Sequence, residues 1–217
     1  MKKILFFGDS ITDAGRCRDR SFDNLGSLGM GYVRSIAGAL MAKDPTQYTV
    51  MNVGISGDRI VDLYARIKKD VWNHSPDIMS ILVGVNDIWH EIDVQNGVDV
   101  ERFDKMYRLL IEDTITRFPN LKIILCEPFI LEGTATIPRK DGFAILVDYQ
   151  KVVKNIALDY GLYFLPLQEP FNEAANKYGA YYYSDDGVHP NTAGAELIAK
   201  CWLELFYREI DKEKNTK

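Results

Sequence analysis

The sequence predicts an α/β fold: a flavodoxin-like three-layer α/β/α sandwich around a five-stranded parallel sheet. Two observations lead to this prediction. Five short apolar runs recur along the chain, and longer segments with helical periodicity separate them. Runs that are almost continuously apolar are typical of strands covered on both faces, as in parallel sheets. The predicted strands are residues 4–7, 48–53, 78–83, 121–126 and 162–165.

The segments between these strands carry apolar residues three and four positions apart, a spacing that places them on one face of a helix. Alternating strands and helices make right-handed crossovers, so we expect helices on both faces of the sheet. In such a sheet, ligands bind outside the carboxyl ends of the strands. The five predicted stripes are Val33, Ile36, Ala37, Leu40 and Met41; Ile60, Leu63, Tyr64, Ile67 and Val71; Phe103, Tyr107, Leu110, Ile111 and Thr114; Leu146, Val147, Val153, Ile156 and Ala157; and Ile198, Cys201, Trp202, Leu205 and Phe206.

The composition is that of an ordinary globular domain. Of the 217 residues, 47% are hydrophobic and 26% are charged, and a chain of this length can bury most of its apolar surface. Repeats, low-complexity tracts and linkers are absent, so we expect one domain over residues 1–210 and a frayed tail over residues 211–217. The formal net charge of −5 argues against nucleic acid and anionic membranes as partners.

The N-terminus and the cysteines indicate a cytoplasmic protein. Two lysines precede only four strongly apolar residues before Gly8, and a secretory signal needs a longer apolar run. No stretch approaches the roughly 18 apolar residues that a membrane span requires. The three cysteines show no CxxC spacing. Cys126 and Cys201 are expected to be small buried hydrophobic residues in a reduced compartment.

A candidate nucleophile follows the first predicted strand, in the segment GDSITD of residues 8–13. Ser10 lies just past the carboxyl end of that strand, where such sheets bind ligands, and Gly8 allows the backbone to turn tightly. Taken alone, the segment is also consistent with Ser10 or Thr12 capping the following turn. The Gly-x-Ser-x-Gly elbow of the α/β-hydrolases is absent.

A candidate base lies near the other end of the chain, in the segment DGVHP of residues 186–190. Asp186, three residues before His189, can accept a hydrogen bond from Nδ1 of the ring, which leaves Nε2 free to take a proton from a serine hydroxyl. Asp185 is the alternative acid. Pro190 is expected to open the final helix. The other two histidines, His74 and His90, have no comparable context.

Two further turns are expected at the same edge of the sheet: GISGD after the second strand and GVND after the third. The tetrahedral intermediate of ester hydrolysis carries an oxyanion, which needs preorganised N–H donors. Gly57 and Ser10 can supply backbone N–H groups, and Asn86 can supply its side-chain amide. Glycine and asparagine are each ordinary in turns. Four such segments at strand ends together favour a catalytic site.

These four segments resemble the catalytic blocks of the SGNH (GDSL) hydrolases, whose name-giving residues are here Ser10, Gly57, Asn86 and His189. The resemblance covers nearly the whole chain and implies the SGNH hydrolase fold. It also implies hydrolysis of esters or thioesters through an acyl-enzyme on Ser10, with His189 as base and Asp186 as its orienting acid. Ser10, Gly57 and Asn86 would form the oxyanion hole. Neither a metal nor a cofactor is called for.

A narrower resemblance concerns the long loop after Ser10, together with GISGDRIVDL and GVNDIW. These segments are similar to the branch that contains acetylxylan esterases and related carbohydrate deacetylases. The similarity implies a serine esterase that acts on small acyl esters, above all acetyl esters, of short oligosaccharides. Two alternatives stay open: a thioesterase or lysophospholipase for longer acyl chains, and a carbohydrate-binding pseudoenzyme. The sequence also leaves open whether the chain forms a homo-oligomer.

Residues around the predicted site have both functional and structural interpretations. Trp89 is either a platform for the sugar or acyl group or a packing aromatic under a loop. Asp9 is counted among the residues near the substrate, although a supporting role or a turn role fits it as well. Residues 132–142 are expected to form a rim loop. The remaining candidates are Arg16, Arg18 and Arg20, which fit carboxylated sugars less well than a solvated loop, and Tyr181, Tyr182 and Tyr183, which are expected to pack.

Overall fold

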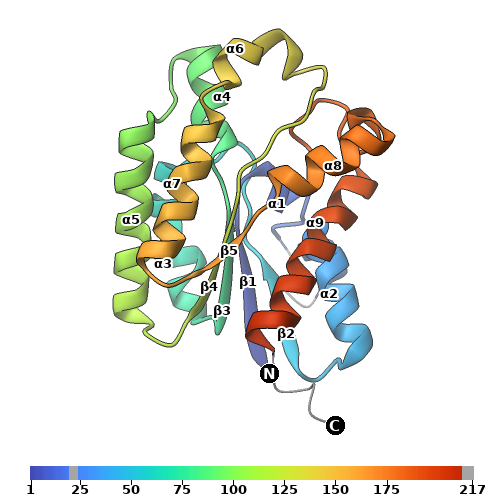
Figure 1. Ribbon diagram of the computed structural model, residues 1–217. Coiled ribbons are helices and arrows are strands. Elements are labelled where there is room, and N and C mark those ends of the chain that lie inside the picture. Colours follow the sequence, from blue (N-terminus) through green and yellow to red (C-terminus); the bar gives the residue numbers. More distant parts are fainter. Residues whose placement is uncertain (20–23, 212–217) are drawn as a thin grey trace.

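A computed structural model of the chain describes residues 1–19 and 24–211 and contains one parallel sheet (Figure 1). The five strands have the order β2-β1-β3-β4-β5, and each neighbouring pair is parallel. The predicted sheet and its flavodoxin-like order are therefore confirmed, with strand ends within two residues of those expected. The strands are β1 (Lys2–Gly8), β2 (Tyr48–Asn52), β3 (Ile78–Leu82), β4 (Lys122–Cys126) and β5 (Tyr163–Leu165).

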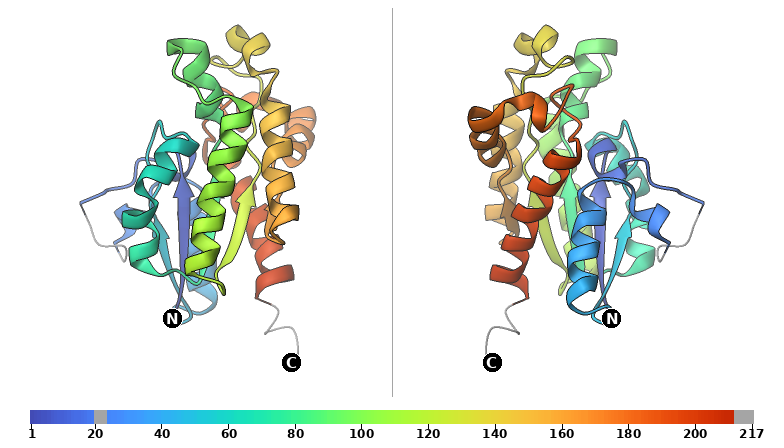
Figure 2. Two further views of the ribbon diagram at one scale, coloured as in Figure 1. Left: turned by 90° about the vertical axis from the view of Figure 1, so that its left-hand side faces the viewer. Right: turned by 90° about the vertical axis from the view of Figure 1, so that its right-hand side faces the viewer.

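Helices cover both faces of the sheet and complete the predicted three-layer sandwich, as the side views of Figure 2 show. Helices α3 (Ile60–Asp70), α5 (Val100–Arg117) and α7 (Leu146–Asp159) form one layer. The opposite layer contains α2 (Tyr32–Lys43), α9 (Thr192–Leu205) and α8 (Gln168–Tyr178). Helix α8 lies in a segment for which the sequence analysis predicted no element.

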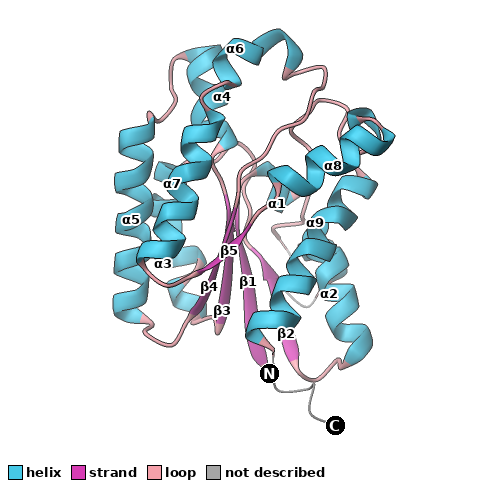
Figure 3. Cartoon of the chain, viewed as in Figure 1, coloured by secondary structure: helices cyan, strands magenta, loops and turns pink. Residues whose placement is uncertain are grey.

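Short elements gather at the carboxyl edge of the sheet (Figure 3). They include α1 (Ser10–Asp13) after β1, α4 (Val85–Val94) after β3, and α6 (Lys140–Phe143). Two segments expected to be loops are thus partly helical: GVND opens α4, and residues 132–142 contain a 3₁₀ turn as well as most of α6. The turns outside the long helices are η1 (Leu25–Leu28), η2 (Trp72–His74), η3 (Ile137–Arg139), η4 (Ala180–Tyr182) and η5 (Phe206–Ile210).

Aromatic side chains fill the core on both sides of the sheet. Phe6 of β1 packs between Tyr32 and Trp202, with ring centroids 5.7 and 5.2 Å away. The predicted stripe of α5 is buried throughout. Four members of other stripes are not: Met41 and Val147 are 38% and 48% exposed, and Tyr64 and Cys201 are partly buried. Helix α7 buries Tyr149, close to Val147 in sequence, on its inner face.

The C-terminal prediction needs one correction. Asp211, expected to fray, is buried, and its N–H donates to the carbonyl of Phe206 at 2.9 Å. The rest of the predicted tail, residues 212–217, lies outside the described residues. Cys126 is fully buried as expected, whereas Cys201 is only partly buried. Over residues 1–19 and 24–211, no helix is long and apolar enough to cross a membrane.

Candidate active site

Ser10 is held at the carboxyl end of β1 by a tight turn. Gly8 ends the strand, and a Cβ at this position would lie 2.3 Å from the carbonyl oxygen of Leu82 on the neighbouring strand, so only glycine fits there. Asp9 caps α1 by accepting a hydrogen bond from the N–H of Ile11 at 3.0 Å. Ser10 is therefore the first residue of α1, with its side chain directed away from the core and partly exposed.

The loop before α9 brings His189 and Asp186 to this serine. Ser10 Oγ lies 2.8 Å from Nε2 of His189, and Nδ1 of the same ring lies 2.6 Å from Asp186 Oδ2. The other carboxylate oxygen of Asp186 accepts hydrogen bonds from the N–H groups of Val188 and His189, both at 2.8 Å. The three side chains therefore form one continuous hydrogen-bonded chain, although 179 positions separate Ser10 from His189.

The charges in this chain favour an ionised acid beside a basic imidazole. Burial opposes ionisation of Asp186, but the hydrogen bonds from the ring and backbone N–H of His189 outweigh it and hold its pKa well below the ordinary value. The hydrogen bond to Asp186 in turn raises the pKa of His189, while burial opposes the rise. A histidine with a raised pKa is a stronger base towards a serine hydroxyl.

Asp185, the alternative acid, makes a different contact: its carbonyl oxygen accepts the N–H of Thr134 at 3.0 Å. Pro190 also differs from its prediction, since α9 begins at Thr192 and Asn191 is the residue that caps it. A capping asparagine accepts two N–H groups here, from Ala193 and Gly194, which proline cannot do. The loop is thus anchored by Asn191.

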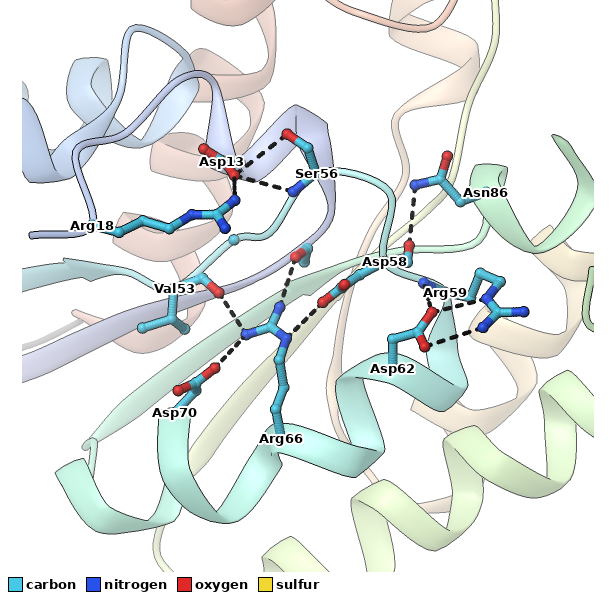
Figure 4. A network of polar contacts seen from close by, with 12 residues as sticks. Asp13, Arg18, Val53, Ser56, Asp58, Arg59, Asp62, Arg66, Asp70 and Asn86 are labelled. Carbon is cyan, nitrogen blue, oxygen red and sulfur yellow. Dashed lines mark hydrogen bonds and ion pairs between the residues drawn. The ribbon is translucent and has the colours of Figure 1, made fainter. Parts of the chain in front are cut away.

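Gly57 and Asn86 follow β2 and β3 at the same edge of the sheet, and Figure 4 shows Asn86 beside Asp58, the residue after Gly57. Gly57 has φ +88°, a left-handed conformation that favours glycine, and no atom lies within 4 Å of where a Cβ would be. Asn86 lies in the first turn of α4, is 8% exposed, and donates one amide hydrogen to the carbonyl oxygen of Asp58 at 3.1 Å. Since an asparagine amide has two hydrogens, the second is free for another acceptor.

Asp9 does not occupy the position expected of a residue that contacts substrate. It is 2% exposed, because its carboxylate turns inward to cap α1. Desolvation by burial raises the pKa of Asp9 to about 7. Asp87, next to Asn86, is fully buried; its carboxylate accepts the N–H of Ile60 at 3.0 Å, and burial raises its pKa to about 8. Both acids support the backbone around the site.

Comparison with known proteins identifies the family. The model of the GDSL-like lipase/acylhydrolase family matches residues 6–197. A curated acetylxylan esterase from Geobacillus stearothermophilus is 37% identical over 218 aligned residues, which cover 98% of this chain and 95% of that protein. The chain belongs to the GDSL-like lipase/acylhydrolase family. The resemblance stated from its four sequence segments is thereby confirmed, as is the prediction that it is a carboxylic ester hydrolase.

Solved structures agree with the assignment of this GDSL hydrolase. A protein from Parabacteroides merdae described as a GDSL-like lipase superposes with a TM-score of 0.90 at 36% identity, covering 94% of both chains. A variant of an acetyl-xylooligosaccharide esterase from G. stearothermophilus superposes with a TM-score of 0.83 at 35% identity, covering 94% of this chain and 93% of that one. The SGNH hydrolase fold predicted from the sequence is confirmed by these neighbours.

Trp89 of this GDSL hydrolase lies beside the acid–base pair. Its ring centroid is 6.1 Å from that of His189, and its indole N–H donates to Asp93 at 2.9 Å. Asp93 also binds the guanidinium of Arg139, which lies over the indole at 5.8 Å. The indole is therefore held in place by a salt bridge while remaining only partly buried.

One hollow adjoins the site, and a larger one lies elsewhere on the molecule. A cavity of about 250 Å³ is lined by Ser10, His189 and mainly apolar neighbours, among them Ile11, Met30 and Tyr32. A groove of about 780 Å³ lies between α8 and residues 130–144, so the predicted rim segment does shape a hollow. Tyr181 and Tyr182, expected to pack, are instead 69% and 66% exposed on a 3₁₀ turn.

The sequence analysis missed several residues that hold the site together. Asn52 is fully buried and its amide donates to the carbonyls of Thr12 and Leu28, at 2.6 and 2.9 Å. Asp13, which follows Ser10 in α1, accepts the N–H of Ser56 at 3.1 Å and pairs with Arg18. Of the other two loop arginines, Arg16 donates to the carbonyl of Gly54 and is half-buried, and Arg20 lies outside the described residues.

Among the residues that the structure describes, no group of three or more histidine, cysteine, aspartate or glutamate side chains could hold a metal ion. The acidic residues near Ser10 are instead engaged by N–H groups and arginines, as described above.

Proposed function

We propose that this chain is a serine esterase that removes acetyl groups from short acetylated oligosaccharides. Ser10 is the nucleophile, His189 the general base, and Asp186 the acid that orients it. The observation that supports these roles best is the hydrogen-bonded chain from Ser10 Oγ through the imidazole to Asp186, with distances of 2.8 and 2.6 Å. The substrate class rests on similarity to the acetylxylan and acetyl-xylooligosaccharide esterases.

In the first half of the reaction, Ser10 Oγ attacks the ester carbonyl while its proton passes to Nε2 of His189. The imidazolium that forms is stabilised by Asp186, which also fixes the tautomer because it accepts a hydrogen bond from the Nδ1–H group. His189 then protonates the alcohol oxygen of the sugar, the ester C–O bond breaks, and the acetyl group stays on Ser10.

The tetrahedral intermediate places a negative charge on the former carbonyl oxygen. We assign its stabilisation to the backbone N–H groups of Ser10 and Gly57 and to the Asn86 amide hydrogen that does not bind Asp58. Donors fixed before the reaction begins need no reorganisation when the charge develops. The carbonyl oxygen of Asp58 contributes to this arrangement because it accepts a hydrogen bond from Nδ2 of Asn86 at 3.1 Å, which fixes the orientation of the amide.

In the second half, a water attacks the acetyl-enzyme and His189 takes its proton. The side chain of His189 is 45% exposed, so water can reach Nε2 once the sugar alcohol has left. Collapse of the second intermediate releases acetate and returns the proton to Ser10 Oγ.

The acyl group is assigned to the cavity of about 250 Å³ beside Ser10. A small apolar pocket gains little from each methylene but can exclude longer chains by contact. A series of 4-nitrophenyl esters from acetate to octanoate tests this assignment. We expect the highest kcat/KM for acetate. A preference for octanoate would instead support the thioesterase or lysophospholipase alternative.

The sugar side is tested with acetylated xylan and its acetylated fragments at equal acetyl concentration. We expect faster acetate release from di- to tetrasaccharides, since the proposed enzyme acts on short chains. Faster release from the polymer would contradict the oligosaccharide proposal.

The cytoplasmic location also stays a prediction from the sequence, and fractionation of the source cells tests it.

A further inference from the structure

Arg66 occupies a buried position among the segments that carry the proposed oxyanion donors (Figure 4). It projects from α3, and its side chain is 13% exposed. Nε donates to Asp58 at 2.6 Å, and Nη1 donates to the carbonyl of Val53 at 2.7 Å and to Asp70 at 2.8 Å. Nη2 donates to the carbonyl of Gly8 at 3.1 Å. One guanidinium thus binds four groups from four places in the chain.

Two of these contacts, to the carbonyl of Gly8 and to the carboxylate of Asp58, lead to the three proposed oxyanion donors. The carbonyl of Gly8 lies two residues before Ser10. Asp58 directly follows Gly57, and the carbonyl of Asp58 accepts the amide of Asn86. The guanidinium therefore binds groups that are bonded to, or within two residues of, all three donors. These donors follow the ends of three different strands.

The chemistry of these contacts requires an arginine. A guanidinium presents five N–H donors in a rigid plane, whereas a lysine ammonium cannot reach acceptors so far apart. Burial raises the pKa of Asp58, and the positive charge of Arg66 opposes this rise and favours the carboxylate. The guanidinium also lies over the ring of Phe7 in β1, 4.5 Å from its centroid, so it packs against the sheet as well.

We propose that Arg66 is a positioning residue for the oxyanion hole. It holds the Gly57–Asp58 turn against the end of β1 and, through the carbonyl of Asp58, fixes the amide of Asn86. Catalysis by such donors depends on their placement to within a fraction of an ångström. This inference rests on the proposed function, because it assigns Asn86 and Gly57 to the oxyanion.

A double-mutant cycle tests the coupling. Arg66→Met should lower kcat for 4-nitrophenyl acetate by about tenfold or more, with KM changed less than about threefold, because the lost interaction acts in the transition state. In an Asn86→Ala background the same substitution should lower kcat by a clearly smaller factor than in the wild type, since the amide that Arg66 positions through Asp58 is already gone and only its effect on Gly57 and Ser10 remains.

Two variants act as controls. Arg59→Met removes a neighbouring arginine that binds Asp62 and the carbonyl of Asn96, and it should leave kcat near the wild-type value. Asp58→Asn keeps the size and the carbonyl but removes the carboxylate that Arg66 binds. It should lower kcat in the same direction as Arg66→Met, and it replaces that variant in the cycle if thermal unfolding shows that Arg66→Met does not fold.

The outcomes separate the two proposals. Equal losses of kcat from Arg66→Met in both backgrounds, or a loss confined to KM, would overturn the positioning role. An unchanged kcat in folded Arg66→Met would overturn it as well. If Ser10→Ala retains wild-type activity, the proposed function itself fails. If Ser10→Ala is inactive while the cycle is additive, only the role of Arg66 fails.

Discussion

The two sides of the site differ in how deeply their charged side chains are buried. The oxyanion side comprises residues 8–10, residues 53–58, Arg66 and the start of α4, and its charged groups are largely buried, with Asp87 fully buried and Arg66 13% exposed. The acid–base loop comprises residues 184–190. There the side chains of Asp186 and His189 are 29% and 45% exposed. The oxyanion side is hydrogen-bonded to the end of β1, and the acid–base loop is exposed to solvent.

This difference follows from what each side has to do. In the proposed mechanism, the oxyanion side stabilises a charge that appears briefly, so its donors must be fixed in advance and kept from water. The acid–base loop would exchange a proton with the leaving alcohol and then with water, so it needs access to solvent. We therefore expect substitutions on the two sides to differ in their effect on turnover, on stability and on pH dependence.

The largest effect is expected in the acid–base loop. His189→Ala should lower kcat by about 10³-fold or more, as in other serine triads. Because the side chain is nearly half exposed, its loss should leave the melting temperature within a few degrees of wild type. Steady-state kinetics and thermal unfolding check this. A large loss of stability would contradict the contrast drawn between the two sides.

Asp186→Asn tests the electrostatics of the same loop. The hydrogen bond to Asp186 raises the pKa of His189, and His189 must be neutral to act as a base. Activity should therefore fall as pH drops through that pKa. Removing the negative charge should lower the pKa of His189 and shift the acid limb of the kcat/KM profile to lower pH, together with a large loss of kcat. An unmoved acid limb would show that another group controls it.

On the oxyanion side, Asn86→Ala should lower kcat roughly 100-fold with little change in KM. The amide is needed most in the transition state, so substrate binding should be nearly unaffected. Kinetics with 4-nitrophenyl acetate measure both constants. If only KM rises, Asn86 binds substrate and is not an oxyanion donor.

The buried acid Asp87 should give this side a characteristic dependence of stability on pH. Burial raises the pKa of Asp87 from 3.8 to about 8, so between these values the folded state binds more protons than the unfolded state. Stability therefore falls as pH rises. Asp87→Asn removes this loss, and the amide oxygen can still accept the N–H of Ile60.

Denaturant unfolding at several pH values checks the prediction. The free energy of unfolding of Asp87→Asn, relative to wild type, should rise by about 1 kcal/mol or more between pH 5 and pH 8. A difference independent of pH would mean that Asp87 is already ionised in the folded protein.

The smallest effect is expected at Trp89. Its indole lies beside His189 but is held by Asp93 and Arg139. We therefore expect it to shape the space in which the substrate binds and to take no part in proton transfer. Trp89→Ala should raise KM for acetylated xylo-oligosaccharides several-fold and change kcat for 4-nitrophenyl acetate less than about threefold. A loss of kcat comparable to that of Asn86→Ala would show that the indole positions the catalytic histidine.

Local patterns in the sequence predict the sheet and the order of its strands, because an apolar run and a helical stripe are each visible over a few residues. They also point to Ser10, His189 and Asp186, since strand ends and a three-residue spacing are local features. The start of α4 is harder to predict, because the glycine and asparagine of GVND suit both a turn and the first turn of a helix.

The supporting residues are harder to predict. Arg66 and Asn52 make their contacts with carbonyl groups of distant segments, and nothing in the neighbouring sequence signals those partners. Asp9 looks like a substrate-binding residue beside the nucleophile, yet the turn after β1 directs it inward. Whether a side chain near a motif points to substrate or to the backbone depends on tertiary structure.

The central claim is that Ser10 is the nucleophile that His189 activates, and covalent labelling tests it most directly. A fluorophosphonate probe should add one equivalent to the wild-type protein, and peptide mass spectrometry should place the adduct on Ser10. His189→Ala should label far more slowly, and Ser10→Ala should not label. A protein that stays unlabelled, or that carries the adduct on another residue, would contradict the account.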